Sequence, residues 1–501
     1  MWITRFQLFL VLSFLCFNWS HGVEKDITVE CLESRATTIN VGGVIANCAS
    51  YGLTRTSTVG PWLFQMADVL QAVNVSYNHI KRVSRFPLLP RVLTLTLRHN
   101  SIREIEPLAF TGLENLQNLD LSFNRIDGES LRGVLVGKKA PERYEPLPIR
   151  VLLLGHNDIS TLDLDTFYHL QYLRELHLDH NPLVINETFS QALRQLPELK
   201  ILNLAEAGLT SLPTDAFSGL RLTNLLLNGN EFTQVPDLSA VGGTLRLLNI
   251  NQNPISQLDA SSFAGIRSVR EIVASGMQKL STIKSGTFSG LENIRVISCS
   301  YNPELVNVEE GAFWDNTAKH FTLQELYLNN NALPRIKKTL LPWIKMSKVT
   351  LDGNRWVCDC RLHWLANYLR NRNSTVDRLT EVKCWDPIWL NGTEMIFWNT
   401  DLVNRHENYP CMVELEEKRQ EQELERIKKI SSETAEGSVK YYHLIAIIGI
   451  IAFVILVGSV IAFNKYRNYR PIYNVEKMSS PMHNEMKSMT GTLAEKSHLV
   501  R

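Results

Sequence analysis

The chain has 501 residues, with 52 Lys or Arg and 51 Asp or Glu, so its formal net charge is +1. This balance argues against a broad basic surface built to grip nucleic acid, and we expect no nucleic-acid partner. Hydrophobic residues make up 44% and charged residues 21%, a composition that can bury a core and excludes a wholly disordered chain.

The N-terminus has the features of a secretory signal peptide. Arg5 precedes an apolar run from Phe6 to Phe17, and the small residues Ser20 and Gly22 follow it. A run of about a dozen apolar residues is too short for a membrane anchor, which needs about 20. We therefore predict that residues 1–22 are removed by cleavage after Gly22.

A second apolar run, Leu444 to Phe463, has 20 residues without a charge. As a helix it would be about 30 Å long, the thickness of the hydrocarbon core of a bilayer. Lys465 and Arg467 follow it, and positive charge stays on the cytoplasmic side. We predict a single transmembrane helix over 444–463 at the plasma membrane, with the N-terminus extracellular and a cytoplasmic tail over 464–501.

Cysteines cluster near both ends of the exported part. Two lie early and four lie late, whereas Cys299 stands alone: Cys31 and Cys48, then Cys358, Cys360, Cys384 and Cys411. Two local clusters in an exported chain predict disulfides, although spacing alone allows three connectivities for the late four. Zinc is the rival for the late cluster, but intervening stretches of 23 and 26 residues are long for a zinc site. We expect Cys299 to be a buried, unreactive thiol.

One nine-residue pattern, LxxLxLxxN with aliphatic substitutions, recurs twelve times in the middle of the chain. The segments are LQAVNVSYN, VLTLTLRHN, LQNLDLSFN, IRVLLLGHN, LRELHLDHN, LKILNLAEA, LTNLLLNGN, LRLLNINQN, VREIVASGM, IRVISCSYN, LQELYLNNN and MSKVTLDGN. Their ninth positions run from 78 to 354, which is 276 residues over eleven intervals and a mean period close to 25. Over about residues 31–411 the chain resembles the extracellular leucine-rich-repeat family.

The resemblance implies a curved solenoid with a parallel β-sheet on its concave face and an α/β-type repeat. Positions 1, 4 and 6 would point into the core, and the ninth-position Asn would bond the backbone of neighbouring turns. Ala207 and Met277 lack that Asn side chain, and a longer interval predicts an exposed irregular loop near 137–148. A second core column on the convex side would comprise Phe110, Phe167, Phe189, Phe217, Phe263, Phe288 and Phe313.

Residues 354–411 are very similar to the cysteine-rich C-terminal cap of that family, through NRWVCDCRLHWLANYLRNRN, KCWDP and LNGTEM. By this resemblance Cys358 pairs with Cys384 and Cys360 with Cys411. Many relatives carry four cysteines in the N-terminal cap, whereas this chain has two, for which we predict the bridge Cys31–Cys48. The expected domains are a signal peptide (1–22), N-terminal cap (23–69), leucine-rich repeats (70–353), C-terminal cap (354–411), charged stalk (412–443), transmembrane helix (444–463) and tail (464–501).

Positions 3, 5, 7 and 8 of each repeat are expected to face outward on the concave side. Position 8 of the first five repeats reads Tyr77, His99, Phe123, His156 and His180. Strands about 4.8 Å apart would bring these rings into a ladder, which favours a partner-binding surface; the alternative is that the rings only shield the sheet edge. Adding His177 does not make a metal site, because no carboxylate or cysteine is fixed beside the histidines, and a pH-sensitive interface is a further hypothesis.

Other outward-facing residues are apolar and extend the candidate partner site: Val151, Leu153, Ile201, Leu226, Leu247 and Val273. An apolar patch rimmed by polar residues marks a contact site. Sequons predict N-glycosylation at Asn74, Asn186, Asn373 and Asn391. In the tail, Tyr469 to Ile472 resembles a tyrosine-based endocytic sorting signal.

No enzyme motif is present: the chain lacks GxxxxGK[ST], HExxH and GxSxG, and a 38-residue tail cannot hold a signalling enzyme domain. We therefore expect no enzyme and no cofactor. The predicted function is that of a cell-surface receptor, co-receptor or adhesion glycoprotein for an extracellular or cell-surface protein, and a homo-oligomer is compatible with it. The alternative is an accessory subunit of a channel or receptor in the same membrane.

Overall fold

The computed structural model describes residues 37–40, 43–54, 68–139, 144–314, 321–371, 374–398 and 423–426. The chain forms two units, residues 1–415 and 416–501, and in the second the described residues 423–426 are helical. Outside the described residues lie the predicted signal peptide, transmembrane span and tail, with Cys31, Cys411, Asn373, Tyr469 and Ile472. Where the structure describes the chain, no helix combines the length and the apolar character needed to cross a bilayer.

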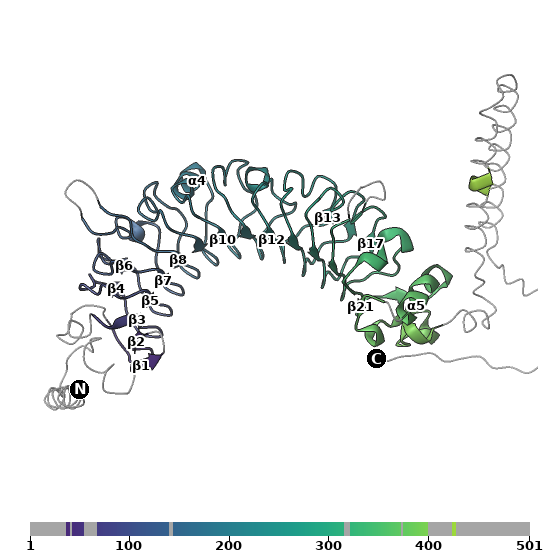
Figure 1. Ribbon diagram of the computed structural model, residues 1–501, viewed down its shortest axis with the longest axis horizontal. Helices are drawn as coiled ribbons and strands as arrows, with labels where there is room; N and C mark the ends of the chain where they lie inside the picture. The colour runs from purple at the N-terminus through teal and green to yellow at the C-terminus, as the bar shows by residue number, and fades with distance from the viewer. Residues whose placement is uncertain are drawn as a thin grey trace, which may run out of the picture. The chain divides into compact units, whose positions relative to one another are not determined.

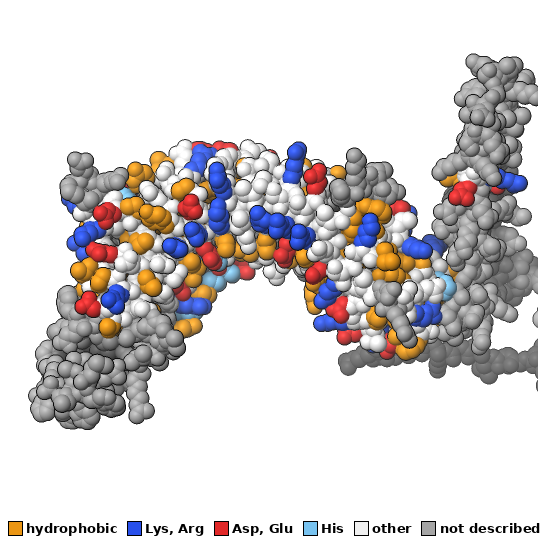
Figure 2. Space-filling model, viewed as in Figure 1, with side chains coloured by type: hydrophobic (Ala, Val, Ile, Leu, Met, Phe, Trp, Pro, Cys, Tyr) orange, Lys and Arg blue, Asp and Glu red, His pale blue; other side chains and the backbone are white. Residues whose placement is uncertain are grey.

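Twelve short parallel strands, one for each predicted repeat, line the concave side of an arc (Figure 1). All but β3 cover positions 3–5 of their repeats, with position 4 buried. Register is fixed by the repeat, because Leu202 lies opposite Leu176 on one side and Leu225 on the other. The strands are β3 (Leu70–Asn74), β5 (Thr94–Thr96), β7 (Asn118–Asp120), β8 (Val151–Leu153), β9 (Glu175–His177), β10 (Ile201–Asn203), β11 (Asn224–Leu226), β12 (Leu247–Asn249), β14 (Glu271–Val273), β16 (Val296–Ser298), β18 (Glu325–Tyr327) and β19 (Lys348–Thr350). The predicted solenoid with a concave parallel sheet is confirmed, and histidine side chains gather on its concave underside (Figure 2).

Both caps extend this sheet to fifteen strands in the described part of the chain. At the N-terminal end, β1 (Thr37–Asn40) and β2 (Gly43–Asn47) form an antiparallel hairpin, and β2 pairs in parallel with β3. At the other end, β21 (Val376–Asp377) pairs with β19. These strands cover backbone groups that the terminal repeats would otherwise present unpaired. The hairpin was not predicted from the sequence.

The convex side is built mostly of turns, so the prediction of an α/β-type repeat was wrong for most repeats. Among the described convex segments of the repeats, α4 (Glu187–Arg194) is the α-helix. The other segments hold the strands β4 (Arg82–Val83), β6 (Glu104–Ile105), β13 (Gln257–Leu258), β15 (Thr282–Ile283) and β17 (Asn307–Val308), with the 3-10 helices η1 (Glu129–Leu131), η2 (Ser239–Val241), η3 (Lys338–Leu340) and η4 (Trp343–Lys345). A short segment cannot offset the cost of helix nucleation. Gly219 and Gly265, with φ of 83° and 84°, end their turns two residues after the buried Phe217 and Phe263.

The predicted convex core column is confirmed. All seven phenylalanines are buried, and the Phe288 ring stacks between Phe263 and Phe313 at centroid distances of 5.1 and 5.4 Å. Seven of the twelve repeats contribute a ring, and rings of consecutive repeats meet only because the repeats stack.

The predicted Asn bonding is also confirmed. Asn253 is 1% exposed, yet its Nδ2 donates to the carbonyl oxygens of Leu227, Ile250 and Asn251, and its Oδ1 accepts from the Phe232 amide. Its hydrogen-bonding capacity is therefore satisfied without water. Where Ala207 replaces Asn, the Leu183 amide bonds the Asn181 carbonyl within its own turn instead.

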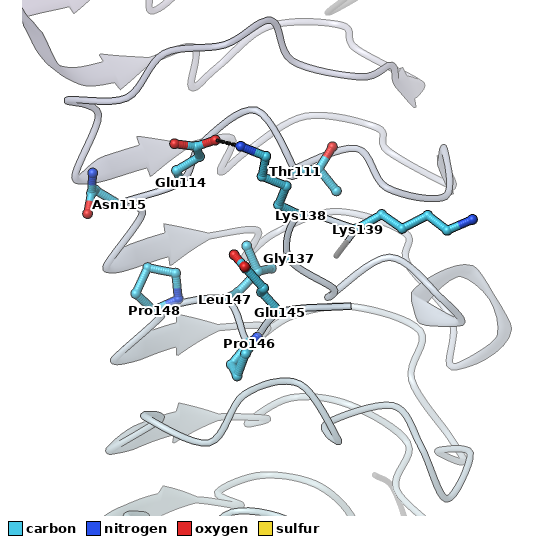
Figure 3. A pocket seen from close by; sticks show the side chains of 10 residues that line it. All are labelled: Thr111, Glu114, Asn115, Gly137, Lys138, Lys139, Glu145, Pro146, Leu147 and Pro148. Carbon is cyan, nitrogen blue, oxygen red and sulfur yellow. Dashed lines mark hydrogen bonds and ion pairs between the residues drawn. The ribbon is translucent and has the colours of Figure 1, made fainter. Parts of the chain in front are cut away.

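The inserted loop near 137–148 lies partly outside the described residues, at 140–143. Its described ends pair through Lys139 and Tyr144, and a polar depression lies beside them (Figure 3). There the Lys138 ammonium is 3.2 Å from the Glu114 carboxylate, whereas Lys139 points away. The loop is exposed at these lysines, as predicted, but Leu147 is buried.

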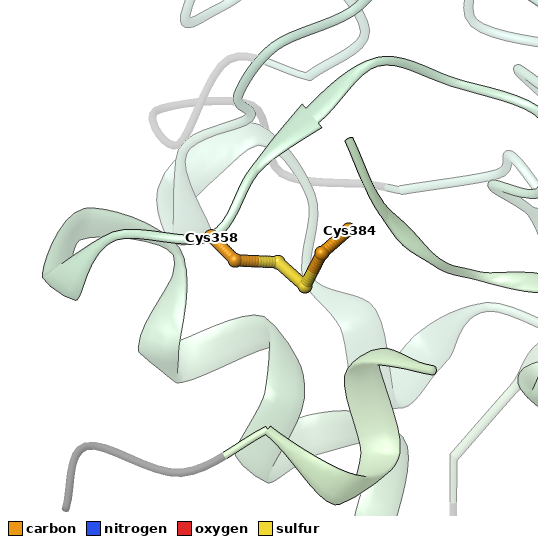
Figure 4. The surroundings of a disulfide bond; sticks show 2 residues. All are labelled: Cys358 and Cys384. Carbon is orange, nitrogen blue, oxygen red and sulfur yellow. A yellow bond between two sulfur atoms is a disulfide. The ribbon is translucent and has the colours of Figure 1, made fainter. Parts of the chain in front are cut away.

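The C-terminal cap contains the predicted bridge Cys358–Cys384, with Cα atoms 5.6 Å apart (Figure 4). The bridge excludes these two thiolates as zinc ligands. Cys48 and Cys360 are also disulfide-bonded, but their predicted partners lie outside the described residues. The cap elements are β20 (Trp356–Val357), η5 (Cys360–Leu362), α5 (His363–Arg370), β21, η6 (Leu379–Glu381), β22 (Cys384–Asp386), η7 (Ile388–Leu390) and η8 (Met395–Phe397).

Cys299 is a free, fully buried thiol, as predicted. Burial raises its pKa to about 12, so the thiol stays protonated and unreactive at neutral pH.

Candidate functional site

Five rings at position 8 stack in one column along the edge of the concave sheet where its strands end. Their centroids are 4.4 Å apart for Tyr77 and His99, 4.1 Å for His99 and Phe123, 3.9 Å for Phe123 and His156, and 3.7 Å for His156 and His180. Neighbouring planes differ by 15° to 23°. The predicted ladder, here called the ring column, is confirmed as a structure; its role in partner binding stays a prediction.

A left-handed backbone conformation orients the ring column. All five residues have φ between 52° and 56°, in a region that L-residues adopt at a cost of about 1–2 kcal/mol. The chain turns there so that the next residue, the Asn, can reach the backbone of the adjacent turns. Glycine occupies the same position in three later repeats, at Gly229, Gly276 and Gly353, and this was a sequence signal for the turn that we missed.

Position 7 does not face outward as expected in several repeats. Ser76, Ser122 and Ser300 are buried there. Their hydroxyls bond polar side chains of the strand layer; the Ser122 Oγ, for example, donates to the Asp120 carboxylate at 2.6 Å. The outward-facing surface is thus narrower than the sequence suggested.

An acid–histidine cluster (Glu175, His177, Asp179, His180 and Glu206) lies at the end of the ring column. The His180 Nε2 is 2.7 Å from the Glu206 carboxylate, and its Nδ1 is 3.3 Å from that of Asp179. The His177 Nε2 is 2.7 Å from the Glu175 carboxylate. A Cβ atom at Gly155 would lie 2.8 Å from both Asp179 carboxylate oxygens, so the glycine makes room for Asp179.

The pKa of His177 in the cluster and those of His156 and His99 in the ring column are shifted in opposite directions. Burial by itself lowers the pKa of His177, but hydrogen bonds to Asp179 and Glu175 outweigh it and hold the pKa above the usual value. Burial, followed by the charge of His180, lowers the pKa of His156. Burial and then Arg98 lower the pKa of His99. His99 and His156 of the ring column therefore favour the neutral form, whereas His177 in the adjacent cluster favours the charged form.

A carboxylate does lie beside the histidines, contrary to what the sequence alone indicated. His156, Asp179 and His180 each offer a ligand atom, and these atoms lie within 4.8 Å of one another. Imidazole nitrogens with a carboxylate form a ligand set that zinc accepts. Next to His180 and Glu206, a depression of about 590 Å³ opens where Ala207 takes the place of the Asn.

Replacing Asp179 by asparagine should lower the pKa of His177, because the charge that favours the imidazolium is removed. Because the pKa of His177 is raised in the folded chain, its interaction with Asp179 and Glu175 stabilises the fold fully below about pH 6.5. This stabilisation is lost as the pH rises through the folded-state pKa of His177. The pKa of His156 is lowered, so the fold favours its neutral form, and its contribution to stability is present above about pH 6.5 and lost as the pH falls below that value. Titration of the imidazole resonances by NMR measures both values.

The matched control for this titration is Glu104→Gln, which removes an exposed carboxylate from the repeat region and should leave His177 unchanged. A native His177 that titrates below the usual histidine value would contradict the arrangement of the cluster.

The predicted apolar residues on the concave face are all half-buried, but they do not form one continuous patch. Leu153 lies opposite His177 in the register, and Leu226 lies between Asn203 and Asn249. Ile201 is likewise flanked by Glu175 and Asn224. The concave face is therefore a mosaic in which apolar and polar side chains alternate from strand to strand.

The predicted glycosylation sites differ in exposure. Asn186 and Asn391 are exposed, and the Asn186 Oδ1 also caps α4 by accepting from the Phe189 amide at 2.9 Å. Asn74 is half-buried on β3, where its Nδ2 donates to the Asn47 side chain at 3.0 Å.

Family models match the parts of the chain that carry this geometry. A leucine rich repeat model matches residues 68–126, and a BspA type leucine rich repeat region model matches 154–270 and 242–338. The solenoid is a leucine-rich-repeat domain. Its strands, its Asn bonds and its Phe column are the repeated features of these matched segments.

Relatives share part of this leucine-rich-repeat domain. The chain is 29% identical to podocan-like protein 1 of Mus musculus over 210 residues, which cover 40% of this chain and 35% of that protein. It is 25% identical to Tsukushi-A of Xenopus laevis over 239 residues (46% and 58%) and 26% identical to lumican of Homo sapiens over 212 residues (42% and 50%). The chain thus spans between about a third and three-fifths of these relatives' lengths.

Among solved structures, a chain of the octameric complex of latrophilin 3, Unc5D and the FLRT2 leucine-rich repeats superimposes with a TM-score of 0.51 and 20% identity. The match covers 73% of this chain and 98% of that chain. At this identity the likeness is one of fold.

Proposed function

We propose that this chain is a membrane-anchored, extracellular leucine-rich-repeat protein that binds a protein partner through its concave sheet, as a receptor, co-receptor or adhesion molecule. The observation that carries the proposal is the mosaic surface over β8 to β12, where half-buried apolar side chains alternate with polar ones. Protein interfaces of the non-obligate kind have this mixed character. The FLRT2-containing complex supports it by analogy of fold alone.

A rigid scaffold underlies this surface. Every strand of the mosaic is hydrogen-bonded to its neighbours, and the core behind it is fully buried. A rigid surface loses little conformational freedom when a partner binds, which increases affinity. The ring column borders the same sheet and adds exposed aromatic area at Tyr77, which is 56% exposed.

Membrane anchoring through residues 444–463 and export directed by residues 1–22 belong to this proposal. The disulfide Cys358–Cys384 supports it, because such bonds persist in oxidising extracellular compartments. We include N-glycans at the exposed Asn186 and Asn391. An accessory subunit in the same membrane is the alternative, and it would co-purify with a multi-span protein, whereas an adhesion molecule would make mixed cells adhere.

The double substitution Leu153→Glu and Leu226→Glu should strongly weaken binding of the partner. Both side chains lie on the concave face outside the core, so folding should survive while two charges enter a contact that must lose its water. We expect a loss of about 2 kcal/mol or more, which is at least about a thirtyfold drop in affinity. The partner is first captured by proximity labelling on intact cells, and binding is then measured with the full chain displayed.

The control is Thr214→Glu on the exposed convex side, which should change little. If the double variant reaches the cell surface folded and still binds the captured partner, the concave mosaic is not the binding site.

A further inference from the structure

Position 2 of seven consecutive repeats, from the turn of β8 to that of β16, carries six cations. They are Arg150, Arg174, Lys200, Arg246, Arg270 and Arg295, with Thr223 in the fourth place. We call this set the basic row. The chain as a whole has a net charge of +1, so the row concentrates positive charge in one place.

The basic row is a continuous line in space. Each member donates its backbone amide to the carbonyl oxygen of the member before it, from Arg174 and Arg150 to Arg295 and Arg270, and all six of these bonds are 2.8 Å long. Neighbouring strands are about 4.8 Å apart, so six steps span about 29 Å. Figure 2 shows Lys and Arg side chains along the flank of the arc that faces the viewer.

The row's charges are not neutralised by the protein. All five arginines are exposed and Lys200 is half-buried, and none of the six forms an ion pair with a carboxylate in the described part of the chain. Some cations elsewhere do form ion pairs: Arg194, for example, contacts both Glu187 and Asp215. Guanidinium groups without a partner are suited to an external anion, which they can bind through two parallel hydrogen bonds.

An aromatic depression lies within the row. It has a volume of about 400 Å³ and is lined by Arg150, Gln171, Tyr172, Arg174, Pro197 and Glu198. Tyr172 is 53% exposed, so its ring is available to pack against the C–H face of a sugar while the arginines on either side bind anionic groups. Glu198 disfavours a sulfate at that one point of the depression and can accept a hydrogen bond from a sugar hydroxyl there.

We propose that the basic row binds a linear sulfated polysaccharide, which runs across the strands with one sugar ring on Tyr172. A linear polyanion matches a straight line of cations, and the aromatic depression favours a carbohydrate over an acidic peptide. The choice of a sulfated polysaccharide over nucleic acid rests on the extracellular location in the proposed function. The row lies at position 2, outside the strands, so this site is separate from the concave mosaic.

The test uses the full-length chain in detergent and heparin as the probe. The variant R174E/R246E/R270E should lose at least tenfold in affinity and elute from immobilised heparin at lower salt, because fewer counterions are released on binding. The control R103E/R125E/R355E changes the same charge at exposed arginines outside the row and should bind within about twofold of the native chain. Affinity should rise with oligosaccharide length until the row is spanned.

Two further measurements separate the ligands. Tyr172→Ala should weaken heparin binding several-fold and leave any binding of polyglutamate unchanged. Equal binding of polyglutamate and heparin, or equal losses in the two triple variants, would overturn the proposal. If R174E/R246E/R270E still binds the protein partner, its effect on heparin binding belongs to the basic row, and the concave mosaic remains intact as the proposed partner site.

Discussion

Replacing Phe288 by alanine should lower the free energy of unfolding of the repeats around it by about 3–5 kcal/mol. The ring is fully buried, and its neighbours Phe263 and Phe313 stack on both faces. Because each ring is held by its own turn, neither neighbour can move to fill the cavity, and both lose contact area. Urea unfolding with the disulfides intact measures the loss.

The control is Tyr168→Ala, another convex aromatic that is 53% exposed and should cost less than about 1 kcal/mol. A solenoid depends on contacts between neighbouring repeats, so damage at Phe288 should also increase local proteolysis at the adjacent turns. If Phe288→Ala lowers the free energy of unfolding as little as Tyr168→Ala does, the stacked phenylalanines do not contribute to the stability of the repeats.

Replacing Cys384 by serine should destabilise the C-terminal cap by about 2–5 kcal/mol and reduce surface display. The substitution breaks the bond to Cys358. Cys384 also lies opposite the buried Trp356 in the pairing of β22 with β20. The loss of the bond frees the end of the solenoid to open. The thermal unfolding midpoint and the surface level of the full chain measure the effect.

Cys299→Ala is the matched control, because it removes a buried cysteine that has no disulfide. It should reach the surface normally, at the cost of a small cavity. The double variant Cys358→Ser and Cys384→Ser distinguishes the lost bond from the free thiol, since it leaves no unpaired cysteine at the bridge. If the double variant regains native stability, the bond itself is not what stabilises the cap.

The functional surfaces were only partly predictable. The ring column follows from the repeat, because position 8 recurs one strand further on each time. The acid–histidine cluster does not, because Asp179 enters it through the space left by Gly155, a residue 24 positions earlier. The mosaic was predicted as a patch, although the repeat itself places position 5 of one strand beside position 5 of the next and therefore Leu153 beside His177.

The sequence by itself determined the period, the twelve strands, the buried phenylalanines and the bonding of the Asn side chains. Each of these depends on contacts between adjacent turns, so a constant interval along the chain becomes a constant spacing in the solenoid. The tertiary structure decided that the convex segments are mostly turns, and that within the described part of the chain the arginines at position 2 form no ion pair while Arg194 has two carboxylate partners. Spacing alone left three pairings of the late cysteines open, and the bridge Cys358–Cys384 was predicted only from the family resemblance. Helix formation in a short segment, disulfide pairing and ion pairing depend on which side chains arrive from elsewhere in the fold, and a repeat pattern does not encode those neighbours.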